Sequence, residues 1–284
     1  MPTLNKPGIV LAPYGTLYLP ALATYDRIRV AYERAFPGSP VRLAFTSRLM
    51  IERVREKEGI SVPGLPATLA ELHDLECESA VVQSLQIVPG GEFHQAAALV
   101  QALQSVAKPC SLRLAVGLPL LSGLPDCRRV ASILPSFWGT AAGANAADNT
   151  LETQGREEAV LLVGHGTGHP ADALYSLLAH VLKRENRNVF LGSIEGYPGL
   201  FELVPELKGC AARAVRLLPF LLVAGGHAQN DISGQSPASW KSVLEREGFS
   251  VFADLRGLGE CPEIVSLFLE HTRSALSKME NRSK

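Results

Sequence analysis

The sequence has little of several features that mark large classes of protein. Aromatic residues make up only 6% of its 284 residues, although 46% are hydrophobic, so the core must consist mostly of Leu, Val and Ala. Basic and acidic residues nearly balance, to a formal net charge of −1. A nucleic-acid-binding protein needs a basic face or stripe, and nothing in the sequence indicates one. We therefore expect no nucleic-acid partner.

Cysteine is also scarce, and no two of the five cysteines form a CxxC pair. They are scattered along the chain as Cys77, Cys110, Cys127, Cys210 and Cys261. This distribution favours buried, reduced thiols in a reducing compartment over a disulfide framework. A metal site built from thiolates would need the cysteines to be clustered, and they are not.

Long apolar runs are missing as well. No stretch reaches the 18 or so uninterrupted apolar residues of a membrane-spanning helix, and the best candidate, AVRLLPFLLVAGG, contains Arg216 and Pro219. The opening residues MPTLNKP have no apolar segment ahead of a cleavage site, so they do not resemble a signal peptide. We therefore expect a cytoplasmic protein with no membrane partner.

Apolar runs of strand length, alternating with longer amphipathic stretches, are what the sequence does contain. The expected strands are GIVLAP, VRLAFTS, AVVQSLQIVP and SLRLAVGLP, then AVLLVGHG, NVFLGSIEG, AVRLLPFLLVAGG and FSVFADL. The expected helices cover residues 22–35, 48–58, 91–106, 170–184, 237–247 and 262–278. Strands that alternate with helices indicate parallel sheets in an α/β fold.

The chain is long enough for two domains of ordinary size. Residues 136–157 are mostly small and polar, which predicts a linker or crossover between an N-terminal domain at 1–135 and a C-terminal domain at 158–284. The opening of this segment, Ser136-Phe137-Trp138, could instead form an aromatic lip of a functional site.

The two halves match each other in three places, in the same order. GIVLAPYGT matches AVLLVGHGT, LAFTSRLM matches FLGSIEGY, and VVQSLQIVPGGEFHQ matches VRLLPFLLVAGGHAQ. Tyr14 thereby stands opposite His165, and Glu92 opposite His227. Three ordered matches favour a duplicated α/β domain over chance similarity among Val- and Leu-rich strands. Ligands of open α/β sheets bind outside the carboxyl ends of the strands, so we expect two such domains to form an interdomain cleft.

Three polar residues stand where three successive strands of the second half should end: His165, Glu195 and His227. Each follows an apolar run and lies among glycines. Taken singly, each histidine can be a hydrogen-bonded turn residue, and Glu195 can be a residue at a helix N-terminus. Neighbouring parallel strands lie only about 4.8 Å apart, so the three side chains together can reach one ion. Two imidazoles and a carboxylate suit Zn, Fe, Co or Ni.

Other common sites are not supported. The dinucleotide pattern G-x-G-x-x-G, begun at Gly164 and Gly166, needs a glycine where His169 stands, and no Walker motif is present. We therefore expect neither NAD nor ATP. No G-x-S-x-G elbow and no convincing pair of glycosidase carboxylates occur either.

Several of these motifs resemble one known family. They are GHGTGHPADALYSLL, GSIEGYPG, LPFLLVAGGHAQNDISG, Ser239-Trp240 and GLGE in the second half, with AFTSRLMIERV and VVQSLQIVPGGEFHQ in the first. Together they are similar to the anaerobic sirohydrochlorin cobaltochelatases, from about Gly8 to about His271. The sequence departs from the family at Gly226, where an acidic residue is common, and at Gln86, where a histidine is frequent.

The resemblance implies a class II, ATP-independent chelatase with two Rossmann-like domains, which inserts one divalent ion into a tetrapyrrole. Its metal residues fall on His165, Glu195 and His227, the three that the strand pattern selects. The implied reaction is insertion of Co²⁺, with Fe²⁺ as the alternative ion, into sirohydrochlorin for cobalamin or sirohaem. Pyrrole protons must leave, and His165, then Glu195, are the expected acceptors.

The first half is expected to bind the tetrapyrrole. Backbone N–H groups at Gly15-Thr16 and at the turn that holds Glu92 suit its carboxylates, as helix N-termini suit anions. Arg48 can pair with a carboxylate, or be a solvated residue at a helix start. Tyr14 can contact the ring or be an ordinary core-edge tyrosine, and Gln86 is a further candidate contact.

Two alternatives and one open question accompany this prediction. The chain could be a metal or haem carrier without turnover, because fold alone does not separate binding from catalysis. It could also be a ferrochelatase acting on protoporphyrin. A homo-oligomer is compatible with the sequence, which does not determine it.

Overall fold

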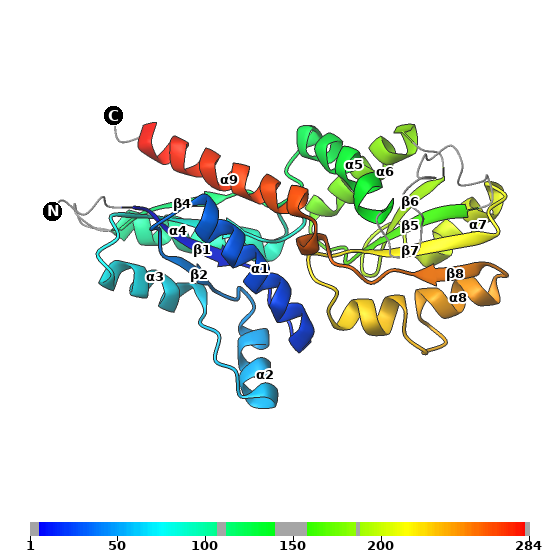
Figure 1. Cartoon of the computed structure of the whole chain (residues 1–284), viewed down its shortest axis with the longest axis horizontal. Helices are drawn as coiled ribbons and strands as arrows, with labels where there is room; N and C mark the ends of the chain where they lie inside the picture. The colour runs from blue at the N-terminus through cyan, green and yellow to red at the C-terminus, as the bar shows by residue number, and fades with distance from the viewer. Residues whose placement is uncertain (1–5, 107–111, 140–157, 186–187, 282–284) are drawn as a thin grey trace. The chain divides into compact units, whose positions relative to one another are not determined.

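The computed structural model describes residues 6–106, 112–139, 158–185 and 188–281. The chain divides into two compact units, residues 1–120 together with 262–284, and residues 121–261 (Figure 1). We call them the N-terminal unit and the C-terminal unit. Within the described residues, no helix is both long and apolar enough to cross a membrane.

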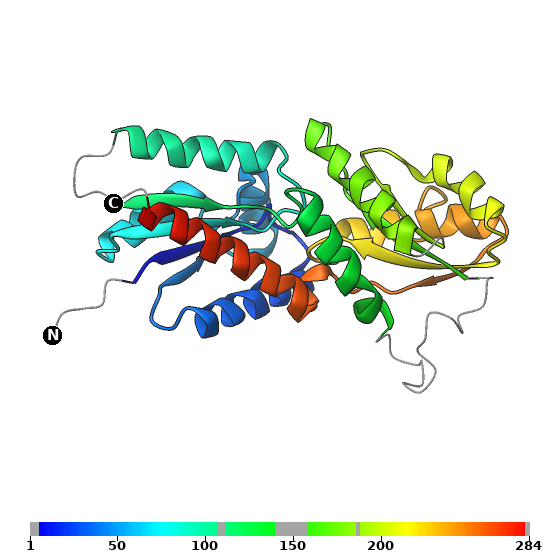
Figure 2. The same ribbon diagram turned by 90° about the horizontal axis from the view of Figure 1, so that it is seen from above.

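The N-terminal unit contains a four-stranded parallel sheet in the order β2-β1-β3-β4. Its strands are β1 (Gly8–Ala12), β2 (Val41–Leu43), β3 (Ser79–Ser84) and β4 (Arg113–Gly117). Its helices are α1 (Leu19–Ala35), α2 (Arg48–Glu58), α3 (Leu65–Asp74), α4 (Gly91–Val106) and α9 (Pro262–Asn281). Figure 2 shows α4 on one side of this sheet and α1 and α9 on the other. Every residue of β1 is buried, as expected for a parallel strand covered on both faces.

The C-terminal unit repeats this plan with a four-stranded parallel sheet in the order β6-β5-β7-β8. Its strands are β5 (Glu158–Gly164), β6 (Val189–Ser193), β7 (Ala214–Phe220) and β8 (Ser250–Ala253). Its helices are α5 (Leu124–Gly139), α6 (Ala173–Glu185), α7 (Leu200–Gly209) and α8 (Trp240–Arg246). Three short helical turns complete it: η1 (Pro170–Asp172), η2 (Ala228–Ile232) and η3 (Leu258–Glu260). One core cluster joins α7 and α8 to the odd-numbered apolar residues of β5 and β7.

The shared strand order confirms the predicted pair of similar α/β domains. In each sheet the first strand along the chain lies between the second and the third, and the fourth follows the third at the edge. The motif matches of the two halves therefore correspond to equivalent strands, β1 with β5, β2 with β6 and β3 with β7. Tyr14 follows β1 as His165 follows β5.

The observed units differ from the expected domain boundaries because two helices change unit. Helix α5 follows β4 in sequence but packs against α6 in the C-terminal unit, and α9 follows β8 but packs on β3 and β4 in the N-terminal unit. Tyr32, Thr272 and Gln83 form a buried hydrogen-bonded chain, with Tyr32 Oη 3.0 Å from Thr272 Oγ1, which donates to Gln83 Oε1 over 2.8 Å. This chain fastens α9 to α1 and β3.

The first four residues of the expected linker are helical. Residues 136–139 are the last turn of α5, because Leu134 and Trp138 continue a buried stripe along that helix. Trp138 is almost fully buried, so it does not form an exposed aromatic lip. The remainder of the expected linker, residues 140–157, lies outside the described residues.

Candidate functional site

Three neighbouring strands of the C-terminal sheet end beside the three predicted metal ligands. His165 directly follows β5, Glu195 follows β6 after one intervening residue, and His227 ends the loop that leaves β7. These strands are adjacent and parallel in the order β6-β5-β7. Their carboxyl ends therefore meet at one edge of the sheet, which is where open α/β sheets bind ligands.

The side chains of these residues lie close together. The rings of His165 and His227 stand edge to face, with centroids 4.6 Å apart and an interplanar angle of 88°. His165 Nδ1 is 3.8 Å from Glu195 Oε2. All three side chains are partly open to solvent, with exposed fractions of 41% for His165, 60% for Glu195 and 47% for His227. An ion can therefore reach them from water.

The three side chains are adjacent without forming a finished ligand set. In the described part of the chain, no three His, Cys, Asp or Glu side chains already converge as a metal-binding group. His165 Nδ1 lies 3.0 Å from the carbonyl oxygen of Gly166, and His227 Nδ1 lies 2.6 Å from Asp231 Oδ2. Binding of one ion by all three would therefore require their side chains to rotate toward a common point.

Backbone contacts extend the sheet past its strand ends and bring Glu195 next to His165. Ile194 N donates to Gly164 O over 3.0 Å, and Glu195 N donates to His165 O over 2.8 Å. Gly166 has a φ of +78°, and a Cβ atom there would overlap the backbone nitrogen of Gly196. Glycine is needed at this position for the left-handed backbone and for the close approach of the two loops.

His227 is oriented by a carboxylate one helical turn further on. It immediately precedes η2, and Asp231 within η2 accepts from Nδ1 over 2.6 Å. With the proton on Nδ1, the lone pair of Nε2 is left for a metal, the arrangement common in histidine ligands. Hydrogen bonding to Asp231 thus suits His227 for ion binding.

Two acidic residues contribute to this edge, and of these the role of Asp172 was not predicted from the sequence. Asp172 accepts backbone hydrogen bonds from Thr167 N over 3.0 Å and from Tyr197 N over 3.2 Å. The sequence offers Asn230 and Asp231 as residues that could orient His227 or cap the next turn, and in the structure Asp231 bonds to His227. His169 has a local role, since its Nδ1 accepts from Ala171 N over 3.1 Å and caps η1.

The first three predicted tetrapyrrole contacts lie just after β1. The side chain of Tyr14 is partly exposed. Gly15 has a φ of +117°, and a Cβ atom there would lie 2.7 Å from the Phe45 ring and 2.9 Å from Met50 Cβ, so this turn requires glycine. Thr16 is buried, and its hydroxyl accepts from Tyr18 N over 3.1 Å. The Thr16 side chain therefore holds the turn together.

The side chains of the other three predicted tetrapyrrole contacts differ in how free they are to bind a substrate. Arg48 is 91% exposed and pairs with Glu52 over 3.0 Å on α2, as a solvated helix residue does. Gln86 is engaged in a local network, donating to Ala12 O over 3.3 Å and accepting from the hydroxyl of Ser84. Glu92 lies in the first turn of α4, where the helix dipole favours an acidic residue.

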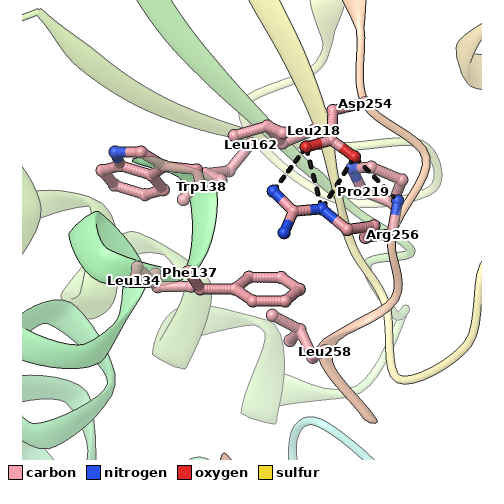
Figure 3. A pocket seen from close by; sticks show the side chains of 9 residues that line it. All are labelled: Leu134, Phe137, Trp138, Leu162, Leu218, Pro219, Asp254, Arg256 and Leu258. Carbon is pink, nitrogen blue, oxygen red and sulfur yellow. Dashed lines mark hydrogen bonds and ion pairs between the residues drawn. The ribbon is translucent and has the colours of Figure 1, made fainter. Parts of the chain in front are cut away.

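A small apolar hollow lies elsewhere in the C-terminal unit (Figure 3). It is lined by Leu134, Phe137, Trp138, Leu162, Leu218, Pro219, Asp254, Arg256 and Leu258. The Arg256 guanidinium lies 4.7 Å from the centroid of the Phe137 ring and pairs with Asp254 over 2.6 Å. The volume of the hollow is about 10 Å³, which is the lower limit for a single water, so the hollow cannot hold a macrocycle.

The sequence matches the family described as Cobalt chelatase (CbiK) over residues 7–277. It is 34% identical over 281 residues to the sirohydrochlorin cobaltochelatase CbiKC of Nitratidesulfovibrio vulgaris, covering 98% of this chain and 93% of that protein. It is 30% identical over 276 residues to the sirohydrochlorin cobaltochelatase of Salmonella typhimurium, covering 96% and 97% of the two chains.

Solved structures show the same fold at low sequence identity. SirB from Bacillus subtilis with Fe³⁺ superposes with a TM-score of 0.63 and 14% identity, covering 97% of this chain and 98% of that one. The sirohydrochlorin chelatase SirB from Bacillus subtilis subspecies spizizenii in complex with cobalt gives a TM-score of 0.61 and 13% identity, covering 97% of each chain.

Proposed function

Because the chain belongs to the cobalt chelatase (CbiK) family, we propose that it is a lyase that inserts Co²⁺ into sirohydrochlorin. The observation that carries this proposal is the meeting of His165, Glu195 and His227 at one edge of the C-terminal sheet. Support comes also from two relatives of that activity, which match over nearly the whole chain. The predicted family is thereby confirmed.

In the proposed mechanism, His165, Glu195 and His227 hold the ion before it is transferred. Imidazole nitrogens and a carboxylate oxygen accept both Co²⁺ and Fe²⁺, so the ligand set admits either. The partial exposure of the side chains favours moderate affinity, because solvent can replace each ligand as the ion leaves. Moderate affinity is required, since the ion must exchange all protein ligands for four pyrrole nitrogens.

Proton balance assigns a second task to the same residues. Each divalent ion that enters the ring displaces two pyrrole N–H protons. A ligand that has just released the ion has a free lone pair and can accept one of them. We propose His165 as the first acceptor and Glu195 as the second.

We propose that the carboxyl edge of the N-terminal sheet contacts the macrocycle. Tyr14 and Arg48 carry exposed side chains that suit a ring edge and a carboxylate, respectively. Gly15 and Thr16 would contribute backbone N–H groups, since the Thr16 side chain is occupied. Gln86 would have to exchange part of its network for the substrate, and Glu92 occupies the place equivalent to His227.

A multiple-turnover assay tests the function. Purified protein, Co²⁺ and excess sirohydrochlorin are mixed anaerobically without ATP, and the change in the absorption spectrum is followed. We expect many ring metallations per chain, and a parallel series with Fe²⁺ ranks the two ions by kcat/KM. A change limited to one equivalent would instead identify a carrier, and preferential turnover of protoporphyrin would identify a ferrochelatase. Independence from ATP and a cytoplasmic location stay parts of this proposal.

A further inference from the structure

We propose that Asp172 is a positioning residue for metal insertion, because its carboxylate joins the loop that carries His165 to the loop that carries Glu195. We call these segments, residues 165–169 and 194–199, the His165 loop and the Glu195 loop. The inference rests on the proposed function, since it assigns Asp172 the task of setting the distance between two of the proposed ligands.

The two oxygens of Asp172 serve different loops. Oδ1 accepts from Thr167 N over 3.0 Å, in the His165 loop, and Oδ2 accepts from Tyr197 N over 3.2 Å, in the Glu195 loop. Both bonds are made to backbone groups two residues beyond a proposed ligand. A carboxylate is a stronger acceptor than a neutral group, so each bond restrains its loop more firmly than an amide oxygen would. With both oxygens engaged, Asp172 acts on the loops and not as a ligand.

Two glycines make room for this bridge. A Cβ atom on Gly166 would overlap the backbone of Gly196, so the loops touch main chain to main chain. A Cβ atom on Gly196 would lie 2.5 Å from Asp172 Oδ1 and 2.7 Å from Oδ2. Asp172 therefore fills the space that a side chain on Gly196 would need. The same close approach allows Glu195 N to donate to His165 O over 2.8 Å.

Asp172 is itself held by its own segment. It ends η1, its backbone nitrogen donates to His169 O over 2.9 Å, and α6 begins at the next residue. Tyr175 in α6 packs beneath β5, because a Cβ atom on Gly164 would lie 2.5 Å from its ring. The carboxylate is thus fixed to the helix that covers the sheet. Loss of the carboxylate would free both loops while leaving this helix in place.

The test compares Asp172→Ala, Asp172→Asn and Gly196→Ala with the wild-type chain. Each protein is titrated anaerobically with Co²⁺ alone to obtain the dissociation constant, and then assayed for kcat and for the KM of each substrate. For Asp172→Ala we expect the Co²⁺ dissociation constant and the KM for Co²⁺ to rise roughly 10–100-fold, the usual cost of losing a partner that orients ligands. The KM for sirohydrochlorin should stay unchanged.

The other two variants separate positioning from general stability. Asp172→Asn keeps one acceptor oxygen and should weaken Co²⁺ binding less than Asp172→Ala. Gly196→Ala pushes the carboxylate away and should reproduce the loss caused by Asp172→Ala. The double variant should then be no worse than either single variant, because both remove the same bridge.

Glu202→Ala is the matched control. The Glu202 carboxylate also accepts one backbone hydrogen bond in this region, from Gly199 N over 3.0 Å, but it does not join two loops. We expect Glu202→Ala to lower thermal stability without changing the Co²⁺ dissociation constant.

The outcomes distinguish the two proposals. Wild-type protein that neither binds Co²⁺ nor metallates the ring would overturn both. An active wild type with unchanged Co²⁺ binding in folded Asp172→Ala would overturn only the role of Asp172. Additive losses in the double variant would do the same. If Asp172→Ala does not fold, Asp172→Asn and Gly196→Ala decide the question by the same measurements.

Discussion

The imidazole rings of His165 and His227 lie edge to face with their centroids 4.6 Å apart, although the two residues follow different strands. Removing either ring should abolish metal insertion and leave the fold intact, because both side chains are partly exposed. We expect His165→Ala and His227→Ala to weaken Co²⁺ binding by more than the roughly 10–100-fold cost of losing an orienting partner.

Anaerobic Co²⁺ titration, turnover with sirohydrochlorin and circular dichroism together check this prediction. His180→Ala is the control, because His180 is exposed on α6 in the same unit and has no proposed role. Full turnover by His165→Ala would remove this residue from the mechanism.

Asp231 should matter through the orientation that it imposes on His227. Its carboxylate accepts from His227 Nδ1 over 2.6 Å, so Asp231→Ala leaves the ring free to rotate and to change tautomer. We expect a loss of roughly 10–100-fold in kcat/KM for Co²⁺, and a smaller loss for Asp231→Asn, whose amide oxygen can still accept. Steady-state kinetics of these variants checks the prediction, with Asn230→Ala, a change at the neighbouring residue, as the control. Equal rates for Asp231→Ala and wild type would contradict the orienting role.

The more deeply a cysteine is buried, the more slowly its thiol should react with an alkylating reagent. Burial, with a smaller effect of the Asp126 charge, raises the pKa of the Cys127 thiol from 9.0 to about 11. Cys127 should therefore stay protonated and react slowly with iodoacetamide at both pH 7 and pH 9, whereas the partly exposed Cys210 reacts faster. Between about pH 9 and pH 11 the thiol ionises first in the unfolded chain, so its contribution to stability falls as the pH rises.

Peptide mapping by mass spectrometry measures both cysteines in one sample. Labelling in denaturant, where both thiols are accessible, gives the reference rates. Labelling of Cys127 as fast as Cys210 in the folded protein would contradict the prediction.

How far the sequence predicts the fold depends on whether the local signals agree. Helices α2 and α4 occur at the predicted residues 48–58 and 91–106. Helix α7 was not predicted, because Pro205 interrupts its sequence, although Leu200, Leu203 and Leu207 mark its buried face. Helices α3 and α5 were not predicted either. The change of unit by α5 and α9 depends on tertiary contacts such as that of Thr272 with Gln83, which no local pattern contains.

In the candidate site, too, local sequence patterns predict some features, whereas others depend on tertiary contacts. Strand ends rich in glycine predict the positions of His165, Glu195 and His227, because parallel strands carry their carboxyl ends to one edge. The bridge made by Asp172 could not be predicted, because it requires two loops to approach across Gly166 and Gly196. The distance between the His165 loop and the Glu195 loop is set by the folded sheet and not by any local sequence pattern.

Three glycines offer a graded test of how the backbone near the proposed macrocycle contacts is built. Gly15 combines a φ of +117° with a Cβ position 2.7 Å from the Phe45 ring. Gly59 has a φ of +66° at the end of α2 but open space around its Cβ position, and Gly91 at the start of α4 has open space and no positive φ. Alanine at Gly15 therefore adds both backbone strain and steric overlap. Alanine at Gly59 adds backbone strain alone, and alanine at Gly91 adds neither.

The free energy of unfolding should follow that order. We expect Gly15→Ala to cost about 1–3 kcal/mol or more, since the strain comes with an overlap that Phe45 must relieve. Gly59→Ala should cost about 1–2 kcal/mol from the left-handed backbone alone, and Gly91→Ala should be neutral or gain about 0.5–1 kcal/mol in its helix. Urea unfolding of the three variants measures the series. If Gly15→Ala proved as stable as Gly91→Ala, the turn after β1 would not need glycine, and its backbone N–H groups would not be held where the proposal requires them.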